Sequence, residues 1–100
     1  MTIQTLKKHI IPTLKNNGAV KIAVFGSFAN GSEKKSSDVD ILVKFKKEIT
    51  LMDLSGMKIK LEDKIGRKVD LITYEGINPR IKKIILNEQK IIYEKRSSEA

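Results

Sequence analysis

Two stretches decide the fold of this chain: VFGSFANG at residues 24–31 and SDVDILV at residues 37–43. The first is typical of the end of a buried strand followed by a Gly-Ser turn. The second is typical of a strand in which alternation places Asp38 and Asp40 on the same face. A Gly-Ser turn beside two carboxylates on consecutive strands indicates a place where a phosphate chain and a divalent metal ion meet.

Hydrophobic periodicity predicts the elements on either side of these stretches. Helices are expected at residues 3–17, 50–65 and 78–87, and strands at residues 20–25, 38–45, 69–73 and 90–94. Pro12 lies inside the first helix, so we expect a kink or a break near Ile11. In the last helix we expect Ile81, Ile84 and Ile85 to be buried. The predicted fold class is α+β, a small mixed β-sheet with helices mainly on one face.

Length and composition restrict the class of protein. The chain has 100 residues, of which 40% are hydrophobic and 32% charged, so we expect a single domain over residues 1–100. The absence of cysteine excludes disulfides and cysteine-ligated zinc. No run approaches the ~20 apolar residues of a membrane span, and the first residues lack a signal-peptide pattern. We therefore expect a cytoplasmic protein.

The net charge of +8 has two interpretations. It can reflect a solvated, lysine-rich surface, or attraction to a polyanion such as a nucleotide, a nucleic acid or an acidic partner. The chain has only three arginines and no stripe of arginine interleaved with aromatic residues. We therefore do not expect direct binding to nucleic acid, and tight, salt-dependent binding to RNA or DNA would contradict this.

Three aspartates carry the chemical hypothesis. Asp38, Asp40 and Asp70 all fall in predicted strands, where aspartate is disfavoured. Two carboxylates at i and i+2, with a third from a neighbouring strand, can hold one or two magnesium ions, and their mutual repulsion argues for a cation. Taken alone, the pattern also fits Asp38 capping the loop and Asp40 lying at a solvated strand end. Likewise Gly26-Ser27 fits either a phosphate contact or a plain turn, but both motifs on consecutive strands favour a nucleotide site.

The same residues carry a resemblance to a known family. The chain has Gly26-Ser27, then ten residues, then Asp38-x-Asp40. This pattern resembles the GS-x(10)-D-x-D signature of the DNA polymerase β-like nucleotidyltransferase superfamily. Residues 66–71, GRKVDL, resemble the strand that carries the third carboxylate in minimal nucleotidyltransferases, and residues 78–94 resemble their closing helix and strand. The resemblance covers nearly the whole chain and implies a palm-like core.

The resemblance also implies a reaction and a role for each residue. Members of the superfamily transfer a nucleoside monophosphate from a nucleoside triphosphate, here ATP, to a hydroxyl group with the help of two Mg²⁺ ions. By matching position, Gly26 and Ser27 would bind the nucleotide. Asp38, Asp40 and Asp70 would be the metal ligands and catalytic residues, with Asp70 also helping to deprotonate the acceptor hydroxyl.

Small members of this kind are similar to the antitoxins of toxin–antitoxin pairs, whose partner is a HEPN-domain ribonuclease toxin. The resemblance implies that AMP is attached to a tyrosine of that toxin, and the short chain favours a partner protein that supplies the acceptor. Phe28 and Asn30 depart from relatives that carry arginine there, and Lys34, Lys35 and Arg67 are the cations that could substitute. This departure leaves an alternative open, in which a weak or inactive member neutralises the toxin by binding alone.

Overall fold

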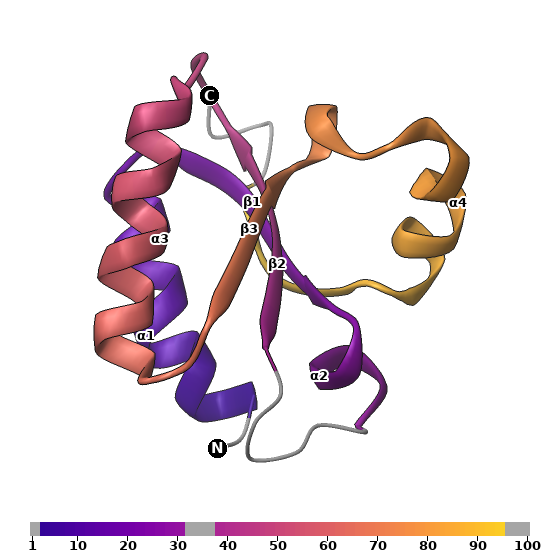
Figure 1. Cartoon of the computed structure of the whole chain (residues 1–100), viewed down its shortest axis with the longest axis horizontal. Coiled ribbons are helices and arrows are strands. Elements are labelled where there is room, and N and C mark those ends of the chain that lie inside the picture. The colour runs from indigo at the N-terminus through magenta and orange to yellow at the C-terminus, as the bar shows by residue number, and fades with distance from the viewer. Residues whose placement is uncertain (1–2, 32–37, 96–100) are drawn as a thin grey trace.

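The computed structural model describes residues 3–31 and 38–95, and the elements follow the predicted order (Figure 1). In chain order they are α1 (Ile3–Lys15), β1 (Ala19–Phe25), α2 (Ser27–Asn30), β2 (Val39–Phe45), α3 (Leu51–Ile65), β3 (Val69–Thr73), the 3-10 turn η1 (Tyr74–Gly76), α4 (Pro79–Glu88) and β4 (Lys90–Glu94). The α+β class with a small mixed sheet is therefore confirmed. No helix in the described ranges is long and apolar enough to cross a membrane.

The four strands form one sheet in the order β3-β2-β1-β4. β1 pairs antiparallel with both β2 and β4, whereas β2 and β3 run parallel. A parallel pair needs a crossover connection of a dozen or more residues, and α3 supplies it here. As a result β2 and β3 begin at the same end of the sheet, which is also the end at which β1 finishes.

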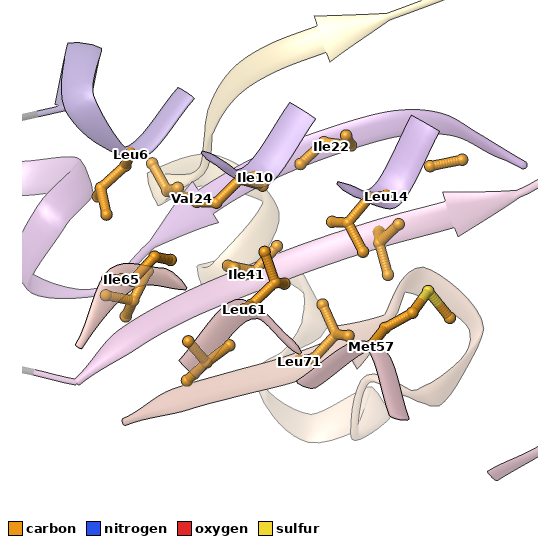
Figure 2. Close-up of a cluster of buried hydrophobic side chains, with 14 of the residues drawn as sticks. Leu6, Ile10, Leu14, Ile22, Val24, Ile41, Met57, Leu61, Ile65 and Leu71 are labelled. Atoms are coloured by element: carbon orange, nitrogen blue, oxygen red, sulfur yellow. The ribbon is translucent and has the colours of Figure 1, made fainter. Parts of the chain in front are cut away.

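The main hydrophobic core lies between the sheet and the helix pair α1 and α3, which cover one face (Figure 1). On α1 the buried apolar side chains are Leu6, Ile10 and Leu14, spaced four residues apart so that they share one helical face. They meet Leu61 of α3 and Ile41 of β2, as Figure 2 shows. All five of these side chains are fully buried.

Local signals set the ends of the helices. Thr50 caps α3: its hydroxyl accepts from the Asp53 amide at 3.1 Å, and the Asp53 carboxylate accepts from the Thr50 amide at 3.4 Å. Gly66 ends α3 in the left-handed conformation. The expected break near Ile11 is wrong, because α1 continues through Pro12 to Lys15. Proline removes one backbone donor, and the buried stripe on the same helix outweighs that loss.

The other face of the sheet carries α4 and a smaller apolar cluster. Ala23, Leu42 and Ile77 form its buried part, with Ile85 and Leu86 of α4 packed against it. The expectation that the isoleucines of α4 are buried is wrong for two of them: Ile81 is 46% exposed and Ile84 57% exposed. This sheet face offers so little apolar area that α4 can bury only one edge of its apolar stripe.

Candidate functional site

Three strands bring the candidate residues to one end of the sheet. Asp40 of β2 lies opposite Phe25, the last residue of β1, and in register with Asp70 of β3. Gly26 follows Phe25 directly, and α2 begins at the next residue beside this end of the sheet (Figure 1). Asp38 immediately precedes β2. The parallel pairing of β2 and β3 therefore places the second and third predicted carboxylates on directly neighbouring residues.

The carboxylates lie on the face of the sheet that carries α4. Leu42 and Ile72 belong to the apolar cluster on that face. Because side chains alternate along a strand, Asp40 shares a face with Leu42 and Asp70 shares a face with Ile72. The residues between them, such as Ile41, point into the main core. The strand that buries Ile41 on one side thus presents a carboxylate on the other.

Gly26 lies very close to the Asp40 carboxylate. A Cβ at Gly26 would lie only 2.5 Å from the Asp40 Oδ2 atom, closer than a side-chain carbon can come. The φ angle of Gly26 is +69°, a left-handed conformation that favours glycine independently. The sequence suggested that glycine leaves room for a phosphate, and the structure adds that it leaves room for the Asp40 carboxylate.

The electrostatics of the site centre on Asp40. Burial, together with the charges of Asp70 and Asp38, raises the pKa of Asp40 from 3.8 to about 6, with burial as the largest cause. Asp70 and Asp38 therefore each lie close enough to repel the charge on Asp40. Such a cluster is stabilised by a cation, and its all-oxygen donor set suits a hard divalent ion.

A closed metal cage is not present among the described residues. In residues 3–31 and 38–95, no group of three histidine, cysteine or acidic side chains is arranged to hold a common ion. The carboxylate oxygens and their mutual repulsion fit Mg²⁺. In the described residues, however, these side chains are not yet arranged around a common ion. Two assignments stay predictions: metal binding by Asp38, Asp40 and Asp70, and nucleotide binding by Gly26 and Ser27.

Of the three cations that could replace the missing arginine, Arg67 lies within the described residues. Phe28 is 1% exposed and belongs to the main core, so its side chain does not face a phosphate. The guanidinium carbon of Arg67 lies 5.5 Å from the centroid of the Phe28 ring. Lys34 and Lys35 lie outside the described residues. The Phe28 side chain therefore contributes packing to the core and offers no cation to a phosphate.

Two lysines that sequence reasoning missed lie beside the carboxylates. A hollow of about 250 Å³ is lined by Asp38, Lys58, Lys68, Val69 and Asp70. Lys68 precedes Asp70 by two residues, a spacing that strand alternation could have flagged. Lys58 comes from α3, and only the packing of that helix beside β3 reveals it.

The chain matches a family of nucleotide-transferring enzymes. The family described as "Polymerase beta, Nucleotidyltransferase" matches residues 8–98. A candidate protein adenylyltransferase of Methanocaldococcus jannaschii is 43% identical over 88 residues, covering 88% of this chain and 95% of that protein. The protein adenylyltransferase MntA of Thermococcus cleftensis is 38% identical over 71 residues, covering 71% and 72% respectively.

Solved structures with the same fold include two toxin–antitoxin complexes. One is a toxin–antitoxin pair with AMP-PNP, with a TM-score of 0.81 at 21% identity over 93% of this chain and 77% of that one. The other is a tri-AMPylated Shewanella oneidensis HEPN toxin with an MNT antitoxin, with a TM-score of 0.76 at 20% identity over 99% and 77%. At these identities the likeness establishes the shared fold.

Proposed function

Because the chain belongs to the polymerase β nucleotidyltransferase family, we propose that it transfers AMP from ATP to a hydroxyl group of a partner protein. The observation that carries the proposal is the register of Asp40 with Asp70, directly beside the Gly26 turn. A glycine turn next to paired carboxylates supplies both elements that nucleotidyl transfer requires, a place for the phosphates and a place for the cation.

Each candidate residue has a role in the proposed reaction. The backbone at Gly26 and Ser27 would bind the triphosphate, and Asp38, Asp40 and Asp70 would hold Mg²⁺. The bound cation would neutralise charge that develops on the phosphate oxygens. The acceptor oxygen forms a bond to the α-phosphorus while the bond from that phosphorus to the bridging oxygen breaks. Pyrophosphate leaves with the bonding electrons, and the hydroxyl proton passes to the carboxylate of Asp70.

The proposed partner is a HEPN-domain ribonuclease toxin, and the proposed acceptor is one of its tyrosines. Two observations support this: relatives over most of the chain are named as protein adenylyltransferases, and the fold recurs in complexes of an MNT antitoxin with a HEPN toxin. Since the substrate is ATP, the proposed compartment is the cytoplasm. Transfer of AMP would then block the toxin, which makes this chain its antitoxin.

The direct test is transfer of label from ATP. The purified chain is incubated with ATP labelled at the α-phosphate and with the HEPN protein encoded beside it. We expect labelled partner protein with Mg²⁺ and none with a chelator. Asp38→Asn combined with Asp40→Asn should abolish labelling while far-UV circular dichroism stays unchanged. A stable complex that acquires no label with Mg²⁺ would overturn the proposal.

A second candidate function is neutralisation by binding alone. The observation that favours it is the lack of a phosphate-facing side chain at Phe28, which is buried in the core. In cells that express the toxin, this candidate predicts that the Asp38→Asn, Asp40→Asn double variant still protects. Loss of protection with complex formation preserved favours the enzyme instead.

A further inference from the structure

We propose that Lys58 and Lys68 select the acceptor, by binding an acidic residue that neighbours the acceptor hydroxyl. The site is the hollow lined by Asp38, Lys58, Lys68, Val69 and Asp70, called the acceptor hollow below. The inference rests on the proposed function and adds to it the chemistry of the segment that receives AMP. It assigns Lys58 and Lys68 a role in specificity, separate from that of the carboxylates.

The strand order places the acceptor hollow on one side of Asp40 and the Gly26 turn on the other. β2, with Asp40, lies between β1 and β3 in the sheet. Gly26 follows β1, whereas the acceptor hollow lies at the start of β3 and against α3. In phosphoryl transfer the attacking and leaving oxygens lie roughly in line on opposite sides of the phosphorus. If Gly26 and Ser27 hold the phosphates as proposed, pyrophosphate leaves on the β1 side and the attacking hydroxyl arrives from the β3 side.

The charges in the acceptor hollow are arranged for a ligand. Two lysines and two aspartates share this small volume, yet neither Lys58 nor Lys68 comes within 4.0 Å of a carboxylate oxygen in the described ranges. Lysines that only balanced Asp38 and Asp70 would be expected to pair with them. A lysine ammonium is a compact charge that attracts a carboxylate. An acidic side chain entering between these lysines would gain two favourable interactions.

A second hollow, lined by leucines on one part and by Ser55, Lys58 and Asp70 on the other, adjoins the first and offers an apolar surface to the ring of an aromatic acceptor. It measures about 120 Å³, shares Lys58 and Asp70 with the acceptor hollow, and is also lined by Leu51, Leu54, Ser55 and Leu71. Leu51 is 83% exposed, so its side chain is available to a ligand. An aromatic ring against leucine, with its hydroxyl near Asp70, would leave a neighbouring acidic residue facing the lysines. The recognised segment is therefore a tyrosine with an aspartate or glutamate beside it.

The test compares two double variants of equal charge. Lys58→Gln with Lys68→Gln removes both lysines of the acceptor hollow. The control, Lys47→Gln with Lys60→Gln, removes two exposed lysines that do not line it. With the HEPN partner as acceptor, we expect the first variant to raise KM for the partner about tenfold, with kcat and KM for ATP within about twofold of the parent. The control should match the parent.

Two further measurements keep the inference falsifiable. Calorimetric titration of the partner should show the same loss of affinity for the Lys58, Lys68 variant, while AMP-PNP affinity stays unchanged. Replacing acidic residues beside the acceptor tyrosine by glutamine should remove the difference between parent and variant. A fall in AMP-PNP affinity would assign the lysines to the triphosphate and overturn the inference, as would unchanged partner affinity. If the parent transfers no AMP but the affinity difference remains, the proposed function fails and the acceptor hollow stands.

Discussion

The two faces of the sheet differ in what they contain. The face under α1 and α3 buries a continuous set of aliphatic side chains, among them Ile41 and Leu61. Among the described residues, the face under α4 has a buried cluster of Ala23, Leu42 and Ile77, and Ile84 is more than half exposed. The carboxylates belong to this second face. The comparison indicates that one face supplies most of the folding free energy, which leaves the other free to hold mutually repelling charges.

Strand β2 shows how a single sequence serves both faces. Val39, Ile41 and Val43 point to the main core, and Asp40 and Leu42 point to the α4 face. A shift of one residue in register would bury the aspartate and expose the isoleucine. The cost of that shift fixes the register of β2 with β3, and therefore also fixes Asp40 beside Asp70. Packing on one face thus positions the chemistry on the other.

The largest predicted effect is on the core face. Leu61→Ala removes a fully buried side chain from α3 and should lower the free energy of unfolding by roughly 3 kcal/mol, because it loses apolar burial and leaves a cavity. Ile84→Ala on α4 is the matched control, since its side chain is 57% exposed and should cost well under about 1 kcal/mol. Urea denaturation of both variants measures the difference. Equal losses would show that the α4 face contributes as much to stability as the core.

The next effect concerns Gly26 and separates its two constraints. Gly26→Ala imposes a side chain on a positive φ and places its Cβ against the Asp40 carboxylate, so we expect a loss of about 1–2 kcal/mol together with displacement of Asp40. Gly18→Ala, at the other end of β1, also has a positive φ but no atom within 4 Å of the added Cβ. Gly18→Ala should lower the free energy of unfolding but leave Mg²⁺-dependent AMP transfer intact.

The measurements for this pair are thermal unfolding and AMP transfer. Both glycine variants should melt below the parent, and only Gly26→Ala should also lose transfer. Wild-type transfer by Gly26→Ala would mean that the close approach of Gly26 to Asp40 has no role in the reaction. Loss of transfer in both variants would trace the defect to stability alone.

Much of the fold follows from local sequence signals. The strands at 69–73 and 90–94 match the prediction residue for residue, and α3 (Leu51–Ile65) matches the helix predicted over residues 50–65 to within one residue. These signals are local: alternation, a capping box and a left-handed glycine. Two expectations failed because they depend on the whole fold. The break near Pro12 did not form because tertiary burial holds α1, and Ile84 is exposed because the sheet face opposite α4 is small and polar.

The candidate site, too, could be predicted from local sequence signals only in part. Alternation in the sequence placed Asp38 and Asp40 on one face, but only the parallel pairing of β2 with β3 brings Asp70 into register with Asp40. Strand order is a global property that a single sequence does not reveal. Lys58 was missed for the same reason, since a helix residue beside a strand is found only after the two have packed.

The smallest predicted effect is the stability cost of the charge on Asp40. Because its folded pKa of about 6 lies above 3.8, the folded protein binds a proton more tightly than the unfolded chain, and stability falls as pH rises from about 4 to 6. Asp40→Asn removes that cost. Without metal at pH 7.5 the variant should be more stable than the parent by about 1 kcal/mol, a figure that allows for solvent screening of a half-buried group. At pH 4 the gain should vanish.

Asp63→Asn, an exposed position on α3, serves as the control and should show no such pH-dependent gain. Denaturation curves recorded with a chelator from pH 4 to 8 measure both variants. Added Mg²⁺ should then stabilise the parent but not Asp40→Asn, because a bound cation offsets the repulsion that the asparagine has already removed. If Asp40→Asn is less stable than the parent at pH 7.5 with chelator present, the carboxylate contributes to folding. The division of the sheet into a stabilising face and a charged face would then be wrong at Asp40.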